Sequence, residues 1–397
     1  MRLLFVTQHL PYPPVSGARR REYELIKRLS KWIDVVVVAI SKVYEEDAQY
    51  VSALETIVKK VYLYQANSQL SLRSANEMNI SLQVNRNYSK ALLSDISNIV
   101  QNERIDIIHI EGFFMYYSIE SLNIDVPIVL CEQNIEYDIW SQQISYQNQT
   151  LSCVYKRQAE IVQLYERHAW LMVDAIVSVT EDDANVINSY LKHNKCKVVT
   201  NGYDHFPNLF DTCMPVPTNK HDFNILYVGN FDYFPNEDAA SFLVIDVLPL
   251  INNQISDIKL YLVGNIGGSG VESLASETVV VTGRVDNLAS YYINADVVVC
   301  PLRFGGGIKT KVLEALQYDK VIVISPIGLQ GIHVSDESPF IVASEKSEFA
   351  SVLINLYNHP EMIEDKSSKC RIMRKAWTTW DDSALQLYYI YNNILEQ

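Results

Sequence analysis

The stretch "VVVCPLRFGGGIKTKVLEALQYDKVIVIS", residues 297–325, has two short apolar runs on either side of a segment of helical length. We expect strands at 297–302 and 321–325, with a helix between them that follows three consecutive glycines. Near-continuous apolar strands joined by a helix are typical of a parallel sheet that is covered on both faces. The stretch therefore predicts a strand–helix–strand unit of an α/β protein.

The same alternation of strands and helices extends over the whole chain in two sets. We expect strands at 2–7, 35–40, 105–111, 127–132, 175–180 and 197–200, and then at 224–229, 259–264, 279–283, 297–302, 321–325 and 340–343. Two such sets predict two doubly wound, Rossmann-like domains. Because open α/β sheets bind ligands beyond the carboxyl ends of their strands, we expect the domains to face each other across a ligand-binding cleft.

The two sets of strands are separated by "YDHFPNLFDTCMPVPTNKHD", in which prolines and polar residues interrupt the periodicity. A last helix should begin near Asp381 or Asp382. No strand follows it, so we expect it to pack back onto the first domain. The alternative is an ordinary last helix of the second domain. The predicted parts are 1–204, 205–376 and 377–397.

Length and composition agree with two soluble domains. The 397 residues exceed what one hydrophobic core usually organises. Apolar residues make up 48% and charged residues 20%, which excludes wholesale disorder. The net charge of −14 and the pI near 5.1 argue against general nucleic-acid binding. The six cysteines form no CxxC pair, and we expect reduced thiols at Cys131, Cys153, Cys196, Cys213, Cys300 and Cys370.

The sequence also bears on location. No apolar run approaches the roughly 18–20 residues of a membrane span, and "RLLFVT" (2–7) is too short for the apolar part of a signal peptide. We therefore expect a cytoplasmic protein. One alternative is that a basic amphipathic helix also makes peripheral contact with the inner membrane face. The other is that the cations of this helix form an ordinary solvent-exposed face. The cations concerned are Arg19, Arg20, Arg21, Lys27, Arg28 and Lys31.

The glycine-rich segment after 300 is the main candidate site. Gly305, Gly306 and Gly307 permit positive φ angles and let a ligand approach the backbone. Nearby cations suit phosphate groups, arginine by bidentate contact and lysine as a point charge. Glu314 is open to two interpretations: it bridges Lys311 on a solvated surface, or it accepts hydrogen bonds from a vicinal diol such as ribose. The cations are Arg303, Lys309 and Lys311.

Three further glycines follow strands in the same way. Gly229 ends a strand in "VGNFDYFPNEDA" (228–239), after which we expect Asn236 or Glu237 to cap a helix over 238–248. Gly283 forms a tight turn whose backbone could contact the edge of a base. In the first domain Gly17 precedes a helix, where free N–H groups and the helix dipole favour an anion. The dehydrogenase fingerprint GxGxxG is not found there. Each glycine alone also fits an ordinary turn.

The chain resembles GT-B fold glycosyltransferases of family 4, in particular a bacterial branch. The branch's second domain reads VG-x-x-D-x-x-PN-x-D-A, GRV, PL-R-x-GGG-x-x-x-K-x-x-EA and G-x-x-G. The matching residues are Gly229, Asp232, Pro235, Asn236, Asp238, Ala239, Gly283 to Val285, Pro301 to Glu314, Gly328 and Gly331. The first domain matches more loosely, through Gly17, "IIHIE" (107–111), "EQNIE" (132–136) and "NGYD" (201–204).

This resemblance implies transfer of a sugar from a nucleotide-diphosphate sugar to an acceptor hydroxyl, with retention, without a cofactor and without a bound metal. It places Gly17 against the donor phosphate, Arg303 and a lysine on the diphosphate, and Glu314 on the ribose. Candidate catalytic residues are Arg303, Lys309, Glu111 and Gln133. Candidate donor-binding residues are Gly17, Gly229, Asn230, Gly283, Arg284, Val285, Gly305, Gly306, Gly307, Ile308, Lys309, Thr310, Lys311 and Glu314. Candidate acceptor-side residues are His9, Ser16, Arg19, Asn134 and Glu136.

Two positions depart from the family pattern. Gly306 stands where most members carry the first of two glutamates, so backbone amides would hold the sugar. Gln133 stands where many members carry a histidine, and a glutamine cannot take a proton. In a retaining front-face mechanism the leaving phosphate can itself deprotonate the acceptor. For Glu111, Asn134 and Glu136 an ordinary strand-end or capping role is an equal alternative.

Other functions remain open at this point. A nucleotide-sugar epimerase or hydrolase would need no acceptor, and a catalytically silent nucleotide-sugar-binding protein would fit Gln133 and Gly306. The histidines show no paired metal-ligand spacing, and His109 should be a core residue. "TEDD" (180–183) is expected to cap a helix. We expect a nucleotide sugar and a sugar, lipid-linked or small-molecule acceptor as partners.

Overall fold

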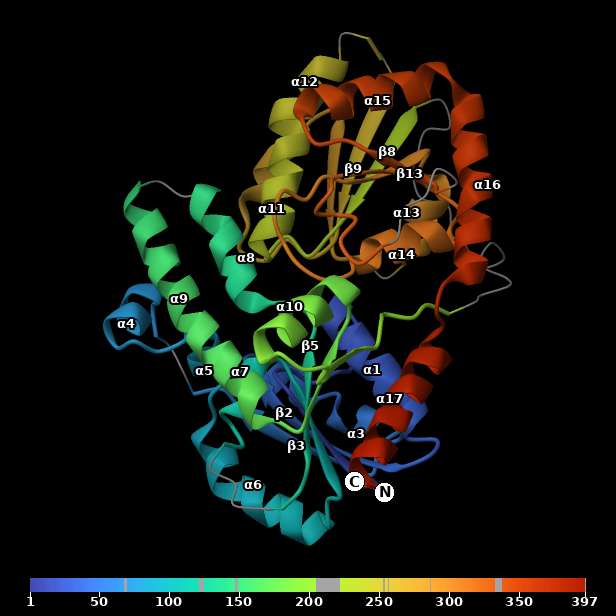
Figure 1. The fold of residues 1–397 in the computed structure, drawn as a ribbon. Coiled ribbons are helices and arrows are strands. Elements are labelled where there is room, and N and C mark those ends of the chain that lie inside the picture. Colours follow the sequence, from blue (N-terminus) through green and yellow to red (C-terminus); the bar gives the residue numbers. More distant parts are fainter. Residues whose placement is uncertain are drawn as a thin grey trace. The chain divides into compact units, whose positions relative to one another are not determined.

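The computed structural model describes the chain except for residues 68–69, 121–124, 147–148, 205–221, 253, 256, 286, 333–337 and 397. The described chain divides into two compact units (Figure 1). The first comprises Met1–Gly202 together with Thr378–Gln397, and the second comprises Tyr203–Trp377. These divisions fall within two residues of the predicted ones. Most of the predicted hinge, including Cys213, lies outside the described residues.

In the described part of the first unit, seven parallel strands form one sheet in the order β3-β2-β1-β4-β5-β6-β7. The strands are β1 (Arg2–Thr7), β2 (Asp34–Ser41), β3 (Lys60–Gln65), β4 (Ile107–Glu111), β5 (Ile128–Glu132), β6 (Ala175–Ser178) and β7 (Cys196–Val198). The helices are α1 (Gly17–Leu29), α2 (Tyr44–Ala48), α3 (Val51–Leu54), α4 (Leu72–Glu77), α5 (Leu82–Arg86), α6 (Lys90–Glu103), α7 (Phe113–Tyr116), α8 (Glu136–Gln143), η1 (Ile144–Tyr146), α9 (Gln149–Met172), α10 (Glu181–Leu191) and α17 (Trp380–Leu395).

Alternate residues of the central strands belong to two different cores, one on each face of this sheet. Leu3 and Phe5 of β1 pack in a core with side chains of α1 and α17, whereas Leu4 and Val6 pack in a core with side chains of α6 and α9. Successive strand residues point to opposite faces, so a strand covered on both sides must be apolar throughout. The last helix α17 lies beside α1 (Figure 1).

The second unit repeats the plan with a sheet of six described parallel strands in the order β10-β9-β8-β11-β12-β13. The strands are β8 (Phe223–Val228), β9 (Ile258–Val263), β10 (Val279–Gly283), β11 (Val297–Cys300), β12 (Val321–Ile324) and β13 (Phe340–Val342). The helices are α11 (Phe234–Ser241), the π-helix η2 (Phe242–Val247), α12 (Leu248–Ile251), η3 (Gly270–Leu274), α13 (Ala289–Asn294), α14 (Thr310–Gln317), α15 (Lys346–Asn358) and α16 (Pro360–Ala376).

These two sheets confirm the predicted fold class of two doubly wound, Rossmann-like domains, and they differ from the prediction in two elements. The sequence analysis missed β3, which lies at the edge of the first sheet and is mostly half-exposed. The helix expected at 238–248 with Asn236 or Glu237 as its cap begins earlier, because Pro235 occupies its first turn and Tyr233 is the capping residue. It then continues through the π-helix.

The capping role expected for Thr180 is confirmed. Thr180 caps α10 by accepting a hydrogen bond from the Asp183 N–H group at 3.0 Å. The five described cysteines are free. In the described part of the chain, none of the helices combines the length and apolar composition that a membrane span requires.

One expectation about α1 is wrong. Arg21 and Arg28 are buried, so they do not belong to an exposed basic face. Arg28 contacts Glu24 and lies 3.2 Å from Asp381 of α17. The basic surface of this helix is therefore smaller than the sequence suggests.

Candidate active site

The glycine-rich loop between β11 and α14 lies at the switch point of the second sheet. The chain adds β9 and β10 on one side of β8, and then adds β12 and β13 on the far side of β11. The connections that follow the neighbouring strands β8 and β11 therefore leave in opposite directions. Open α/β sheets bind ligands at this position. The glycine-rich loop follows β11, and Gly229 and Asn230 follow β8.

The backbone of this loop requires glycine. Gly305 has φ +136° and Gly307 has φ +62°, values that residues with a Cβ rarely adopt. Lys309 is the capping residue of α14, and its ammonium group donates to the carbonyl oxygens of Gly306 (2.9 Å) and Gly307 (2.6 Å). Lys309 therefore closes the loop over the beginning of α14.

Arg303 is oriented by a carboxylate. Its Nε donates to Asp238 of α11 at 2.8 Å, and a second guanidinium nitrogen contacts the other Asp238 oxygen. The guanidinium carbon lies 5.4 Å from the ring centroid of Phe242. A two-pronged contact of this kind fixes the plane of the guanidinium group. About a third of the Arg303 side chain is exposed, so the group is both held in place and accessible.

Lys311 is buried behind the loop. Its ammonium group donates to Asn236 Oδ1 at 2.7 Å and to the Tyr227 hydroxyl at 3.2 Å, and it lies 4.4 Å from the Tyr227 ring centroid. Burial lowers the pKa of Lys311 from 10.5 to about 8. The side chain joins α14 to β8 and α11, and it is placed to position the loop.

Glu314 is held one turn into α14. Its Oε2 accepts a hydrogen bond from the Tyr292 hydroxyl at 2.9 Å, and Tyr292 stacks on Tyr318 with ring centroids 5.1 Å apart. The side chain is half-buried. Of the two interpretations of Glu314, the bridge to Lys311 on a solvated surface does not fit, because Lys311 is buried and directed at Asn236.

Apart from Gly17, which lies on the first unit, the other candidate donor-binding residues lie on the same unit as the loop. Asn230 Oδ1 accepts from Asn265 Nδ2 at 3.0 Å. Gly283 ends β10 with φ +70°, and it is followed by the exposed Arg284 and the half-buried Val285. Ile308 is buried, and Thr310 is the first residue of α14. The structure brings Lys309, Thr310, Lys311 and Glu314 together on one short stretch.

The second candidate cluster lies at the switch point of the first sheet, where β1 and β4 are neighbours. His9 follows β1, and its Nε2 lies 3.0 Å from Glu22 Oε1 of α1. The Thr7 hydroxyl donates to the other Glu22 oxygen at 2.7 Å. Burial raises the pKa of Glu22, and the neighbouring His9 opposes this rise.

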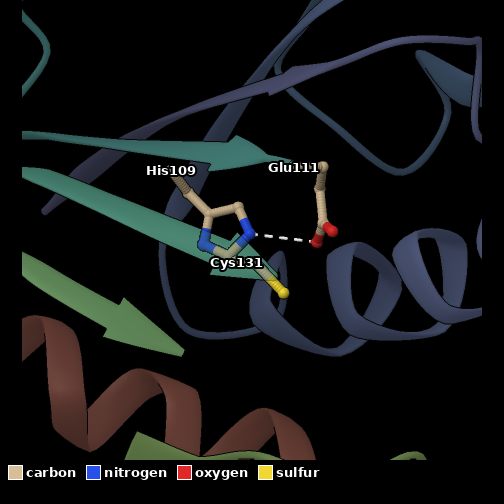
Figure 2. A group of neighbouring side chains, drawn as sticks. All are labelled: His109, Glu111 and Cys131. Carbon is tan, nitrogen blue, oxygen red and sulfur yellow. Dashed lines mark hydrogen bonds and ion pairs between the residues drawn. The ribbon is translucent and has the colours of Figure 1, made fainter. Parts of the chain in front are cut away.

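A chain of hydrogen bonds continues from Glu111 at the end of β4 (Figure 2). Gln133 Nε2 donates to Glu111 Oε2 at 2.9 Å, and His109 Nε2 lies 3.0 Å from Glu111 Oε1. His109 Nδ1 is 2.8 Å from the Tyr391 hydroxyl of α17. Burial by itself would raise the pKa of Glu111, but His109 and Arg21 hold that pKa below its usual value. His109 is a buried core histidine, as expected, and it stacks on Phe5.

His109, Glu111 and Cys131 are the described side chains whose potential metal-ligand atoms all lie within 4.8 Å of one another (Figure 2). Their partners do not suit a metal ion. Both ring nitrogens of His109 are engaged. Arg21 places a cation 3.8 Å from Cys131 Sγ, and burial raises the pKa of that thiol well above its usual value. The group therefore acts as a buried hydrogen-bonding network.

The other first-unit candidates form local contacts. Ser16 caps α1, whose first residue is Gly17, by accepting from the Arg19 N–H group at 3.4 Å. The Arg19 guanidinium lies 3.0 Å from Asp47. Asn134 and Glu136 interact at the start of α8, where burial raises the pKa of Glu136. Among the residues that the structure describes, Ser16 and Arg19 do not form hydrogen bonds with Gln133 or Glu111.

Sequence reasoning missed the partners that hold these residues. Asp238 and Asn236 lay within a quoted motif, but no role was assigned to their contacts with Arg303 and Lys311. Tyr292 and Tyr391 were not identified, and Arg21 was considered only as a cation of the basic helix. Each lies far in sequence from the group that it contacts, and a single sequence has no pattern that reveals such pairs.

The architecture matches solved GT-B glycosyltransferase structures over the full chain. Sucrose-phosphate synthase from Thermosynechococcus elongatus superposes with a TM-score of 0.76 at 16% identity, covering 100% of both chains. HepE from Anabaena, in complex with UDP and glucose, superposes with a TM-score of 0.71 at 13% identity, covering 99% of this chain and 100% of that one. The chain therefore has the GT-B fold.

Sequence comparison adds a narrower likeness. Residues 222–359 match the family model of group 1 glycosyl transferases, and this segment contains the whole glycine-rich loop. A Klebsiella pneumoniae protein described as an "Uncharacterized 44.6 kDa protein in cps region" is 23% identical over 373 residues, covering 89% of this chain and 90% of that protein. The second unit thus carries the sequence pattern of group 1 glycosyl transferases.

Proposed function

We propose that this protein is a glycosyltransferase that moves a sugar from a nucleotide-diphosphate sugar to an acceptor hydroxyl, with retention and without a bound metal. The observation that carries the proposal is the loop at the β8–β11 switch point, where glycine backbone, an oriented arginine and a held carboxylate lie on one short stretch. The family match over residues 222–359 supports it. HepE from Anabaena, which shares the fold, has been described with UDP and with UDP-glucose.

In this proposal each residue of the loop has a distinct role. The amides of Gly305 to Thr310 and the guanidinium of Arg303 receive the negative charge of the diphosphate, and Asp238 keeps Arg303 in place. Glu314 accepts hydrogen bonds from the ribose hydroxyls, while Tyr292 fixes its orientation. Lys311 is reassigned from a phosphate contact to a positioning role, because its ammonium group is bonded to Asn236 and Tyr227.

The reaction breaks the bond between the anomeric carbon and the diphosphate oxygen and forms a bond from that carbon to the acceptor oxygen on the same face. The acceptor proton passes to the departing phosphate, so no protein base is required. Charge that develops on the diphosphate is stabilised by preorganised donors, which is usually the largest electrostatic contribution. Gln133, whose NH₂ group donates a hydrogen bond to Glu111, would accept a hydrogen bond from the sugar or the acceptor at its side-chain oxygen.

Replacement of Glu314 by glutamine tests this assignment. Titration calorimetry with UDP, GDP and ADP should show binding of at least one of them, and Glu314→Gln should weaken it by about tenfold, or about 1.4 kcal/mol, because the charged acceptor for the ribose is lost. Glu272→Gln changes an exposed carboxylate of the same unit and should leave binding unchanged. Equal binding by the wild-type protein and Glu314→Gln would contradict the assignment.

The alternatives differ in their products. Gln133 stands where many members of the resembled family carry a histidine that could accept a proton, and its side chain is hydrogen-bonded to Glu111. This observation favours a catalytically silent binding protein. Mass spectrometry of a donor incubation with a panel of acceptors separates the cases. A glycosylated acceptor supports transfer, free sugar indicates hydrolysis, a changed sugar nucleotide indicates epimerisation, and intact bound donor indicates silent binding.

A further inference from the structure

A groove on the first unit lies outside the two clusters described above. Its volume is about 490 Å³, and its walls come from α8, α9 and α10. We call it the α8–α10 groove, and its lining residues are Tyr137, Arg167, Asn185, Val186, Ser189 and Tyr190. It combines a cation, two aromatic rings and two small polar side chains in a chain of net charge −14.

Arg167 is the charged centre of the groove. Its guanidinium carbon lies 5.3 Å from the ring centroid of Tyr137 and 4.5 Å from that of Tyr190. Its buried Nε has no hydrogen-bond partner among the described residues. The guanidinium group is also hydrogen-bonded to the Tyr137 side chain, which helps to hold it in place. Burial raises the pKa of the nearby Asp138 carboxyl group, and the positive charge of Arg167 partly offsets this rise although the two side chains do not form an ion pair. A guanidinium group held between rings presents its N–H edge to a ligand, in the geometry that suits a carboxylate or phosphate.

The side of the groove formed by α10 suits the hydroxyl groups and the ring of a sugar. Asn185 and Ser189 are four residues apart and exposed, so they share one face of the helix. Their amide and hydroxyl groups can exchange hydrogen bonds with sugar hydroxyls. Tyr190 is 38% exposed and offers a ring face to the C–H surface of a pyranose, and Val186 adds an apolar contact. A few polar groups placed beside an aromatic surface are typical of sites that bind small molecules.

The groove is also joined to the start of α8. Glu166, which precedes Arg167, accepts hydrogen bonds from the N–H groups of Glu136 (2.8 Å) and Tyr137 (3.0 Å). Asn134 and Glu136 at this helix start are acceptor-side candidates. A ligand in the groove would therefore lie against the same helix that carries these candidates.

We propose that the α8–α10 groove binds a saccharide that carries an anionic group, a carboxylate or a phosphate, as part of the acceptor. The anionic group pairs with Arg167, and the hydroxyls contact Asn185 and Ser189. The role as an acceptor subsite rests on the proposed glycosyltransferase function, whereas the binding of the saccharide rests on the groove alone.

Ligand-observed saturation-transfer NMR on the full chain tests this proposal with glucuronate, glucose 6-phosphate and glucose, each measured with saturating UDP present. We expect binding of at least one of the two anionic sugars, with little binding of glucose. The stronger of the two identifies the anionic group. Arg167→Gln should weaken this binding at least tenfold. The matched control is Arg157→Gln, which changes an exposed arginine of the same helix that lies 3.4 Å from Glu160.

A second variant guards against a folding defect in Arg167→Gln. Asn185→Ala combined with Ser189→Ala alters exposed positions only and should also weaken binding of the anionic sugar. Equal binding of glucose and both anionic sugars, or equal binding by Arg167→Gln and Arg157→Gln, would overturn the proposal. Sugar binding without any binding of UDP, GDP or ADP would support the groove and count against the glycosyltransferase function; the reverse result would count against the groove alone.

Discussion

The charged side chains around the glycine-rich loop are each held by a protein partner before any ligand arrives. Asp238 orients Arg303, Tyr292 holds Glu314, and Lys309 binds the carbonyl groups of its own loop. Preorganised groups need no rearrangement when charge develops, which is the condition under which they stabilise a transition state best. The chemistry of the loop therefore depends on residues that come from α11 and α13 as well as on the loop itself.

Lys311 gives a pH-dependent prediction. Its pKa in the folded chain is about 8, below the value of 10.5 for an unburied lysine. Between these pH values the unfolded chain binds more protons, so raising the pH favours the folded state. The free energy of unfolding of the wild-type protein should therefore rise relative to that of Lys311→Met between pH 7 and pH 10. Urea unfolding at several pH values measures this difference, and parallel pH profiles would show that the pKa of Lys311 is not lowered in the folded chain.

The charged residues of the loop could be identified from the sequence, but it could not be predicted which of them are free to contact a ligand and which contact the protein. Arg303, Lys309 and Lys311 look alike as cations close to glycines. Lys309 is buried, but its ammonium group donates to carbonyl groups of its own loop. Lys311 is also buried, and it is directed at Asn236 and Tyr227, which lie 75 and 84 residues away in the chain. The same reason hid Arg21, whose guanidinium donates to Asn201 from 180 residues away.

Among the secondary-structure elements, buried strands were predictable and the edge strand was not. The strands in the middle of both sheets are apolar on both faces, so they appear in the sequence as continuous runs of apolar residues. In β3 only Val61 is fully buried and both ends are exposed, so "KVYLYQ" carries a much weaker pattern. The start of α11 was also misplaced, because Pro235 in its first turn is as compatible with a loop as with a helix.

The last helix is fixed at its start by a capping box. The Thr379 side chain accepts from the Asp382 N–H group at 3.1 Å, and the Asp382 carboxylate accepts from the Thr379 N–H group at 3.0 Å. Thr379→Ala should lower the free energy of unfolding by about 1 kcal/mol. Thr378→Ala is the matched control and should change little. Chemical denaturation measures both, and equal effects would show that the cap is not formed.

For the molecule as a whole, each unit has its own sheet and its own core, and α17 belongs to the core of the first. Leu387 of this helix is fully buried beside β1 and α1 side chains. Leu387→Ala should lower the free energy of unfolding by about 2–5 kcal/mol, because packing contacts are lost and a cavity is left. Hydrogen exchange followed by mass spectrometry should show faster exchange in β1, β2 and β4, while β8 to β13 remain unchanged. Faster exchange in the second sheet only would contradict this division of the chain.

The sequence was sufficient for the two-sheet plan and for the loop that follows β11, because both depend on local patterns of apolar residues and glycines. It was not sufficient for the α8–α10 groove. Tyr137, Arg167 and Tyr190 come from three different helices, and only the packing of those helices brings their side chains together.

The most direct test of the central claim is a crystal structure of the chain grown with a bound nucleoside diphosphate, with UDP as the first choice. We expect the diphosphate to contact the amides of Gly305 to Thr310 and the Arg303 guanidinium, and both ribose hydroxyls to contact Glu314. A well-ordered nucleotide bound elsewhere, with Glu314 still hydrogen-bonded to Tyr292 and not in contact with ribose, would contradict the proposal.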